Sequence, residues 1–210
     1  MNSKINSIKS IIFPSKKINI FVISILFLGL ISGAVFGNII SVNDKTLVID
    51  KIKLFISNIN SDSINGIEVF KNGISVNMLY LGIIWVMGMT FVGVVLNVVI
   101  LFIKSFILGF SLASFIMVYS YKGLILSLIY LLFGQILNIL VIVMVTIYGI
   151  MFSSKLNLII FKNKQDNNIL KFFRNYVFIL IIAIIVSIIS SISEAFLLPA
   201  IIKIIIKLFI

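Results

Sequence analysis

The chain has 210 residues, of which 61% are hydrophobic and 11% are charged. With a mean hydropathy of +1.29, this composition excludes a soluble protein and indicates an integral membrane protein. The net charge of +11 does not indicate nucleic-acid binding, because the basic residues flank apolar runs instead of forming one patch. The sequence contains no cysteine and no histidine, so it lacks disulfides, thiolate metal sites and the commonest general base.

Residues 18–40 form the first apolar run, which follows four lysines and is long enough to cross about 30 Å of hydrocarbon. We interpret it as an uncleaved span, because it is too long for the apolar core of a signal peptide and Val35-Phe36-Gly37 is a poor cleavage site. Gly29, Gly33 and Gly37 recur at every fourth position, which on a helix gives a stripe for close packing. The pattern leaves open whether the stripe packs within the chain or in a homo-oligomer.

Residues 41–77 are the one substantial polar region and hold four of the six acidic residues. Helical spacing separates an apolar face from a polar face within this region. We expect a short amphipathic helix here, either at the membrane surface, against a partner, or simply covering the bundle. The apolar face comprises Val48, Ile52, Phe55, Ile56 and Ile59, and the polar face comprises Asp50, Lys53, Ser57 and Asn60.

Two further apolar segments follow, with Lys104 as a charged break between them. Residues 78–103 predict a second span, which contains Trp85, Gly88 and Gly93. Residues 105–121 predict a third segment, which contains Gly109 and is at the lower length limit for a span. Tyr121-Lys122-Gly123 predicts the turn that follows.

The last two spans carry the polar groups expected at membrane depth. Residues 124–152 include Gln135 and Asn138, which share one helical face. Residues 176–200 include Glu194, the only acidic residue in any apolar segment, on a face with Ser187, Ser190 and Ser191. Because buried amides and acids need partners in lipid, we expect Glu194 to contact the amides of the fourth span. Pro199 should end or kink the last span, and residues 201–210 should lie at the interface.

The basic residues suggest an orientation. The connector 153–175 holds five Lys and Arg residues against one Asp, and the first 17 residues are basic without an acid. Both should be cytoplasmic by the positive-inside tendency. With five spans, the region 41–77 and the C-terminus are then extracytoplasmic.

Enzymatic activity is not expected from these residues. Metalloproteolysis and rhomboid-type proteolysis need histidine, paired membrane aspartates are missing, and no nucleotide-binding motif occurs. We therefore expect no catalytic residue, no metal and no cofactor. A small-solute or ion transporter or channel subunit is an alternative, because Glu194, Gln135 and Asn138 can line a hydrated path.

Three short motifs occur in order along the chain. They are Asn77-x-x-Tyr80-x-Gly82-x-x-Trp85-x-x-Gly88-x-x-x-x-Gly93, then Lys104 with Gly109-Phe110, and finally Ser190-Ser191-x-x-Glu194-Ala195-Phe196-x-x-Pro199.

In order and spacing these motifs resemble the stage II sporulation protein M family over nearly the whole chain. One departure is the fourth span, where the family tends to have a proline-containing break and this chain has Gly134-Gln135. The resemblance implies a role in endospore formation at the mother-cell or septal membrane. It also implies two partners that degrade peptidoglycan, the stage II sporulation proteins D and P, for which this chain would be a membrane platform during engulfment. The expected fold is an all-α bundle of about five membrane helices, 1–210, with one amphipathic helix outside.

Overall fold

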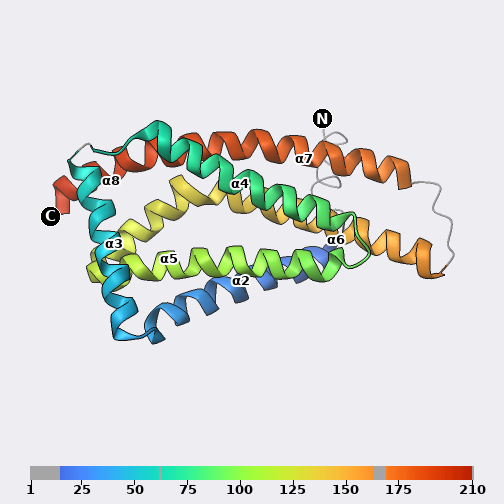
Figure 1. Cartoon of the computed structure of the whole chain (residues 1–210), viewed down its shortest axis with the longest axis horizontal. Coiled ribbons are helices and arrows are strands. Elements are labelled where there is room, and N and C mark those ends of the chain that lie inside the picture. Colours follow the sequence, from blue (N-terminus) through green and yellow to red (C-terminus); the bar gives the residue numbers. More distant parts are fainter. Residues whose placement is uncertain (1–14, 62, 163–168, 210) are drawn as a thin grey trace.

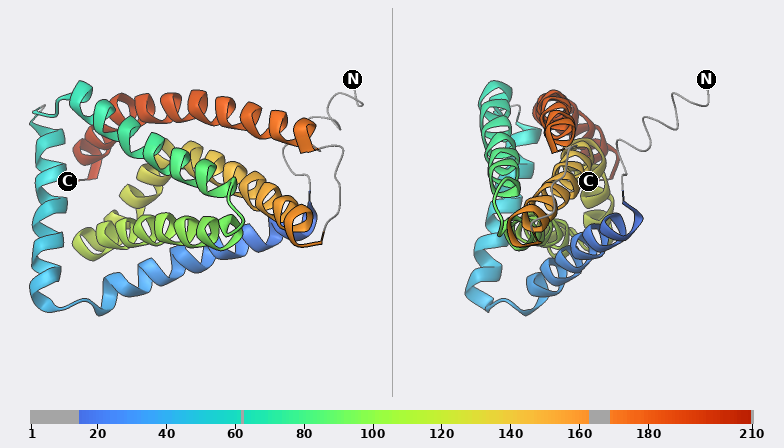
Figure 2. Two further views of the ribbon diagram at one scale, coloured as in Figure 1. Left: turned by 45° about the vertical axis from the view of Figure 1, so that its right-hand side comes forward. Right: turned by 90° about the vertical axis from the view of Figure 1, so that its right-hand side faces the viewer.

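The computed structural model describes residues 15–61, 63–162 and 169–209, and within these ranges every secondary-structure element is a helix. This confirms the all-α class expected from the apolar runs. Most helices run roughly along the long axis of the molecule, while α3 lies across one end (Figures 1 and 2). The elements are α2 (Lys16–Ile39), α3 (Val42–Asn60), α4 (Gly66–Gly88), α5 (Gly93–Ile129), η1 (Tyr130–Gln135), α6 (Ile136–Lys162), α7 (Ile169–Ile192), η2 (Ser193–Leu197) and α8 (Leu198–Phe209).

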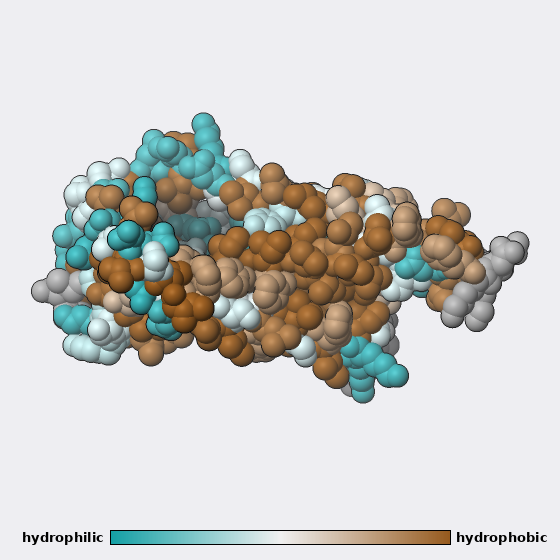
Figure 3. Space-filling view, turned by 60° about the horizontal axis from the view of Figure 1, so that its bottom comes forward, coloured by the Kyte–Doolittle hydropathy of each residue, from teal (hydrophilic) through white to brown (hydrophobic). Residues whose placement is uncertain are grey.

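Four helical stretches among the described residues are long and apolar enough to cross a membrane. One of them, Gly93–Phe161, reverses direction and therefore passes through the bundle twice (Figure 1). The structure thus has five passages, in agreement with the expected number. Apolar side chains cover the flank of the molecule and polar ones gather at the end that carries α3 (Figure 3), as expected for a multi-pass membrane protein.

The reversal occurs at Ser120, which has φ 51° and ψ −125°. This conformation is rare for a residue other than glycine. After it, the chain returns so closely that a Cβ atom on Gly123 would overlap the backbone of Phe115. The turn expected at Tyr121-Lys122-Gly123 therefore lies one residue earlier.

The boundary expected at Lys104 is wrong. Helix α4 begins at Gly66, where the Asn65 side chain accepts hydrogen bonds from the backbone N–H groups of the first turn. It ends at Gly88, and α5 begins at Gly93 and continues through Lys104 without a break. The ammonium group of Lys104 lies 4.7 Å from the centre of the Tyr80 ring, so it is accommodated inside the bundle and does not need the membrane surface.

The amphipathic helix expected in the region 41–77 is present as α3. Its apolar face packs on the bundle, with Ile56 and Ile59 buried, while Asp50 and Lys53 are exposed. The C-terminal tail packs against it, because Ile202 and Ile206 of α8 are buried in the same apolar cluster. Helices α3 and α8 therefore close one end of the bundle together.

Candidate functional site

Two π-helices, η1 and η2, face each other inside the bundle. In η2 the widened turn is closed by the N–H of Leu198 bonding to the Ser193 carbonyl, directly before Pro199, which has no N–H to donate. The chain continues beyond Pro199 as α8, which bends away from the axis of α7 (Figure 1). Pro199 therefore bends this helix without ending it. Widened turns of this kind are frequent at functional sites.

Side chains of the last passage satisfy carbonyl groups of η1. Ser190 Oγ donates to the Gly134 carbonyl at 3.3 Å, and Ser193 Oγ donates to the Phe133 carbonyl. The distortion that the family resemblance raised for the fourth span is thus present without proline, as a π-turn at Gly134. Hydroxyl groups from the facing helix thus donate to backbone carbonyl groups at this turn.

Gln135 and Glu194 form the central polar contact between the two π-helices. Gln135 Nε2 donates a hydrogen bond to Glu194 Oε1 at 2.9 Å, which is the contact expected from the sequence. On the other side of the carboxylate, a Cβ atom placed on Gly73 would lie 3.6 Å from Oε2. The glycine therefore leaves space beside the second carboxylate oxygen.

Asn138 has a different partner from the one expected. Its side-chain amide donates to Asn77 Oδ1, and Asn77 Nδ2 in turn donates to Ser191 Oγ at 3.2 Å. This network links α6, α4 and α7 among buried groups. Sequence reasoning gave Asn77 no role at membrane depth, because the predicted second span began at the next residue.

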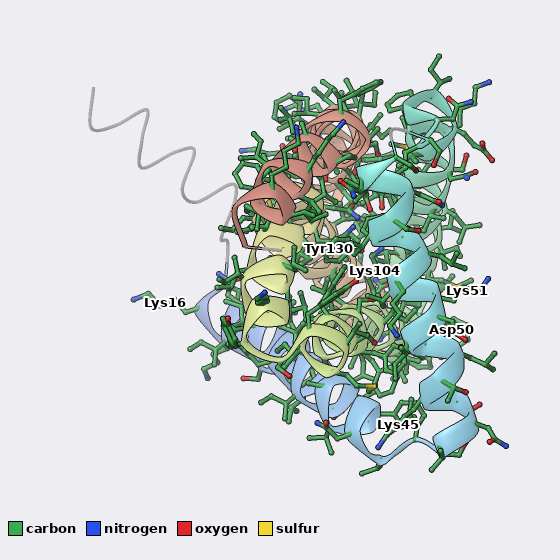
Figure 4. All side chains as sticks on the ribbon, turned by 90° about the vertical axis from the view of Figure 1, so that its left-hand side faces the viewer. Lys16, Lys45, Asp50, Lys51, Lys104 and Tyr130 are labelled. Atoms are coloured by element: carbon green, nitrogen blue, oxygen red, sulfur yellow. The ribbon has the colours of Figure 1, made fainter. Side chains whose placement is uncertain are left out.

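Lys104 is the second charged residue of the site and was expected at a helix boundary instead. It lines a cavity of about 350 Å³ together with Glu194, Gln135, Asn77 and Tyr130. Viewed from the end that carries α3, Lys104 and Tyr130 lie in the interior of the bundle (Figure 4). The site therefore combines an ammonium group, a carboxylate, amides and a phenol in one cavity at membrane depth, an arrangement suited to binding a polar or charged group.

The glycine stripe of α2 packs within the chain. Gly29 and Gly33 lie so close to α5 that a Cβ atom on either would overlap its backbone near Phe106. Gly37 faces Ala113, and Gly109 of α5 approaches the backbone of Leu30. This contact fixes α5, and with it Lys104, against the first passage.

The remaining candidates lie toward the other end of the bundle. The Trp85 ring stacks on Tyr176 with centroids 5.8 Å apart, and Tyr176 Oη donates to the Trp85 carbonyl at 2.9 Å. Gly88 lies beside the Tyr176 hydroxyl, and Gly93 packs on the backbone of Met87 in the turn between α4 and α5. Trp85, Gly88 and Gly93 therefore lie at or near the connection between α4 and α5, and they do not line the cavity that holds Lys104 and Glu194.

Comparison with known protein families gives one result for the chain as a whole. The family model described as Stage II sporulation protein M matches residues 20–199. No curated protein and no solved structure matches the chain.

Proposed function

Because the chain belongs to the stage II sporulation protein M family, we propose that it serves endospore formation as a non-enzymatic membrane scaffold. In this role it recruits or positions proteins that degrade peptidoglycan while the mother-cell membrane engulfs the forespore. The partners are the stage II sporulation proteins D and P, which the family resemblance implies. The lack of histidine and cysteine in the whole sequence supports a role in which the chemistry belongs to the partners.

The observation that carries the proposal is the end formed by α3 and α8. Ile56, Ile59, Ile202 and Ile206 hold these helices on the bundle, so the rest of α3 is presented on a fixed support. Its exposed face carries Asp50 and Lys53, and Leu54, which directly follows Lys53, is 56% exposed. A rigid helix face that combines charges with an exposed leucine is suited to docking another protein.

The basic residues at the opposite end of the bundle support an orientation in which this face of α3 lies on the side of the peptidoglycan. The start of α2, with Lys16 and Lys17, lies at the same end as the start of α7, with Lys171 and Arg174 (Figure 1). By the positive-inside tendency this end is cytoplasmic in the proposal. The end that carries α3 is then extracytoplasmic, on the side where the partners act.

Fluorescent fusions of the proteins D and P test the recruitment step. In sporulating cells that lack this chain, we expect both fusions to spread away from the septum, and restored expression of the chain should return them. A Leu54→Asp chain should not return them, although it reaches the membrane in normal amounts. Normal septal localisation of both fusions in cells that lack the chain would overturn the proposal.

The cavity with Lys104 and Glu194 favours one alternative, a small-solute or ion transporter or channel subunit. Charged side chains at membrane depth are typical of transport paths. Purified chain in liposomes distinguishes the two functions. Solute or ion flux that Glu194→Gln abolishes, together with normal engulfment in cells that lack the chain, would favour transport.

A further inference from the structure

From the cavity that Lys104 and Glu194 line we infer a binding site for a small zwitterion, a molecule that carries one ammonium group and one carboxylate or phosphate. This inference is independent of the proposed scaffold role, because it concerns a small molecule bound by this chain and not the recruitment of partner proteins. Two charged residues, Lys104 on α5 and Glu194 on η2, line the same cavity of about 350 Å³. This volume is of the order of that of small-molecule sites in proteins.

Each of the two charged groups also contacts an uncharged side chain. Glu194 Oε1 accepts its hydrogen bond from Gln135, and the Lys104 ammonium lies over the Tyr80 ring. The cavity therefore presents one positive and one negative group, both on partly exposed residues, and this pairing favours a guest that carries both charges. The ammonium of such a guest would contact Glu194, and its anionic group would contact Lys104.

Uncharged groups of the cavity add hydrogen-bonding capacity without changing its charge balance. The lining includes the amides of Asn72, Asn77 and Gln135, and the hydroxyl groups of Ser111 and Tyr130. A guest with one net charge would be attracted to one of Lys104 and Glu194 and repelled by the other, whereas a zwitterion is attracted to both. The lining therefore selects against simple cations and simple anions.

The cavity also has a route toward the end that carries α3. A second cavity of about 250 Å³, lined by Phe55 of α3, shares Tyr130 and Glu194 with the first. Its remaining lining is largely apolar, including Phe115 and Leu198. A guest can therefore extend an apolar side chain or linker in this direction while its charges stay at Lys104 and Glu194.

Two sources supply this chemistry, a free amino acid or the ethanolamine phosphate head group of a phospholipid. Isothermal titration of the detergent-purified full-length chain with the standard amino acids, glycylglycine and glycerophosphoethanolamine tests both. We expect at least one probe to bind with a Kd of about 1 mM or below. Binding of glycerophosphoethanolamine alone assigns the site to the lipid head group, and binding of an amino acid or glycylglycine assigns it to a soluble zwitterion.

A pair of glycine variants on α4 separates binding in this cavity from binding elsewhere. Gly73→Leu fills the space beside Glu194 Oε2 without changing a charge, whereas a Cβ atom on Gly82 has no neighbour within 4 Å. We expect Gly73→Leu, Lys104→Gln and Glu194→Gln each to raise the Kd at least about tenfold. Gly82→Leu should leave it unchanged. If no probe binds, or if binding survives Gly73→Leu and both charge-removing variants, the inference is wrong.

Discussion

Gln135 and Glu194 meet at 2.9 Å between two π-helices that lie far apart in the sequence. The contact joins the fourth and fifth passages at the depth where Lys104 approaches from the third. Because the amide is the hydrogen-bond donor to Glu194 Oε1, its loss leaves a part-buried carboxylate oxygen without that partner.

The first prediction concerns this contact. Gln135→Leu should lower the free energy of unfolding by about 1–3 kcal/mol, the usual cost of a buried polar group that loses its partner. The double variant Gln135→Leu with Glu194→Leu should be less destabilised than the sum of the two single variants, because it removes both partners. Thermal unfolding in detergent measures this, and additive effects would show that the two residues are not coupled.

The second prediction concerns the packing of α2 on α5. A Cβ atom on Gly33 would overlap the Phe106 backbone, so Gly33→Ala should cost about 1–3 kcal/mol through overpacking. Gly82→Ala is the matched control, because its added methyl group meets open space and alanine favours helix. Equal melting temperatures for the two variants would contradict the close contact.

The third prediction concerns the reversal at Ser120. Its φ of 51° is readily adopted by glycine and disfavoured by β-branched residues. We expect Ser120→Gly to raise thermal stability slightly, by up to about 1 kcal/mol, and Ser120→Val to lower it. If Ser120→Val were as stable as Ser120→Gly, the hairpin would have to turn at another residue.

The fourth prediction concerns orientation. Topology reporters placed after residue 60, between α6 and α7, and after residue 210 should read outside, inside and outside, because the basic ends of α2 and α7 are expected in the cytoplasm. Activity of an extracytoplasmic reporter at the connection between α6 and α7 would reverse the orientation and place α3 in the cytoplasm.

The sequence predicted the helical class, the amphipathic character of α3 and the contact of Glu194 with Gln135, because each depends on local periodicity or on the need of a buried acid for a partner. It misplaced the boundary at Lys104. A lysine within an apolar run suggests a helix end, but its long side chain is accommodated here by Tyr80 and the cavity. The glycines at 88 and 93 were the better signal, since they bracket the true turn.

The partner of Asn138 could not be predicted, because it depends on how three helices from distant parts of the chain come together. Asn77 reaches this network only because α4 begins at Gly66, so that residue 77 lies well inside the helix. The π-helices were also missed as such. Gly134 and Pro199 signalled a distortion, but the hydroxyl groups of Ser190 and Ser193 that bond to carbonyl groups of η1 come from a distant part of the chain.

The central claim is that the chain supports engulfment through the face of α3. Membrane-dye microscopy of sporulating cells that lack the chain, complemented by variants expressed at equal membrane levels, tests it most directly. Leu54→Asp changes an exposed leucine on α3, and Ile67→Asp changes an equally accessible residue, 62% exposed, in the first turn of α4. The account predicts stalled engulfment without the chain, rescue by the original chain and by Ile67→Asp, and no rescue by Leu54→Asp. Normal engulfment in cells that lack the chain would contradict it.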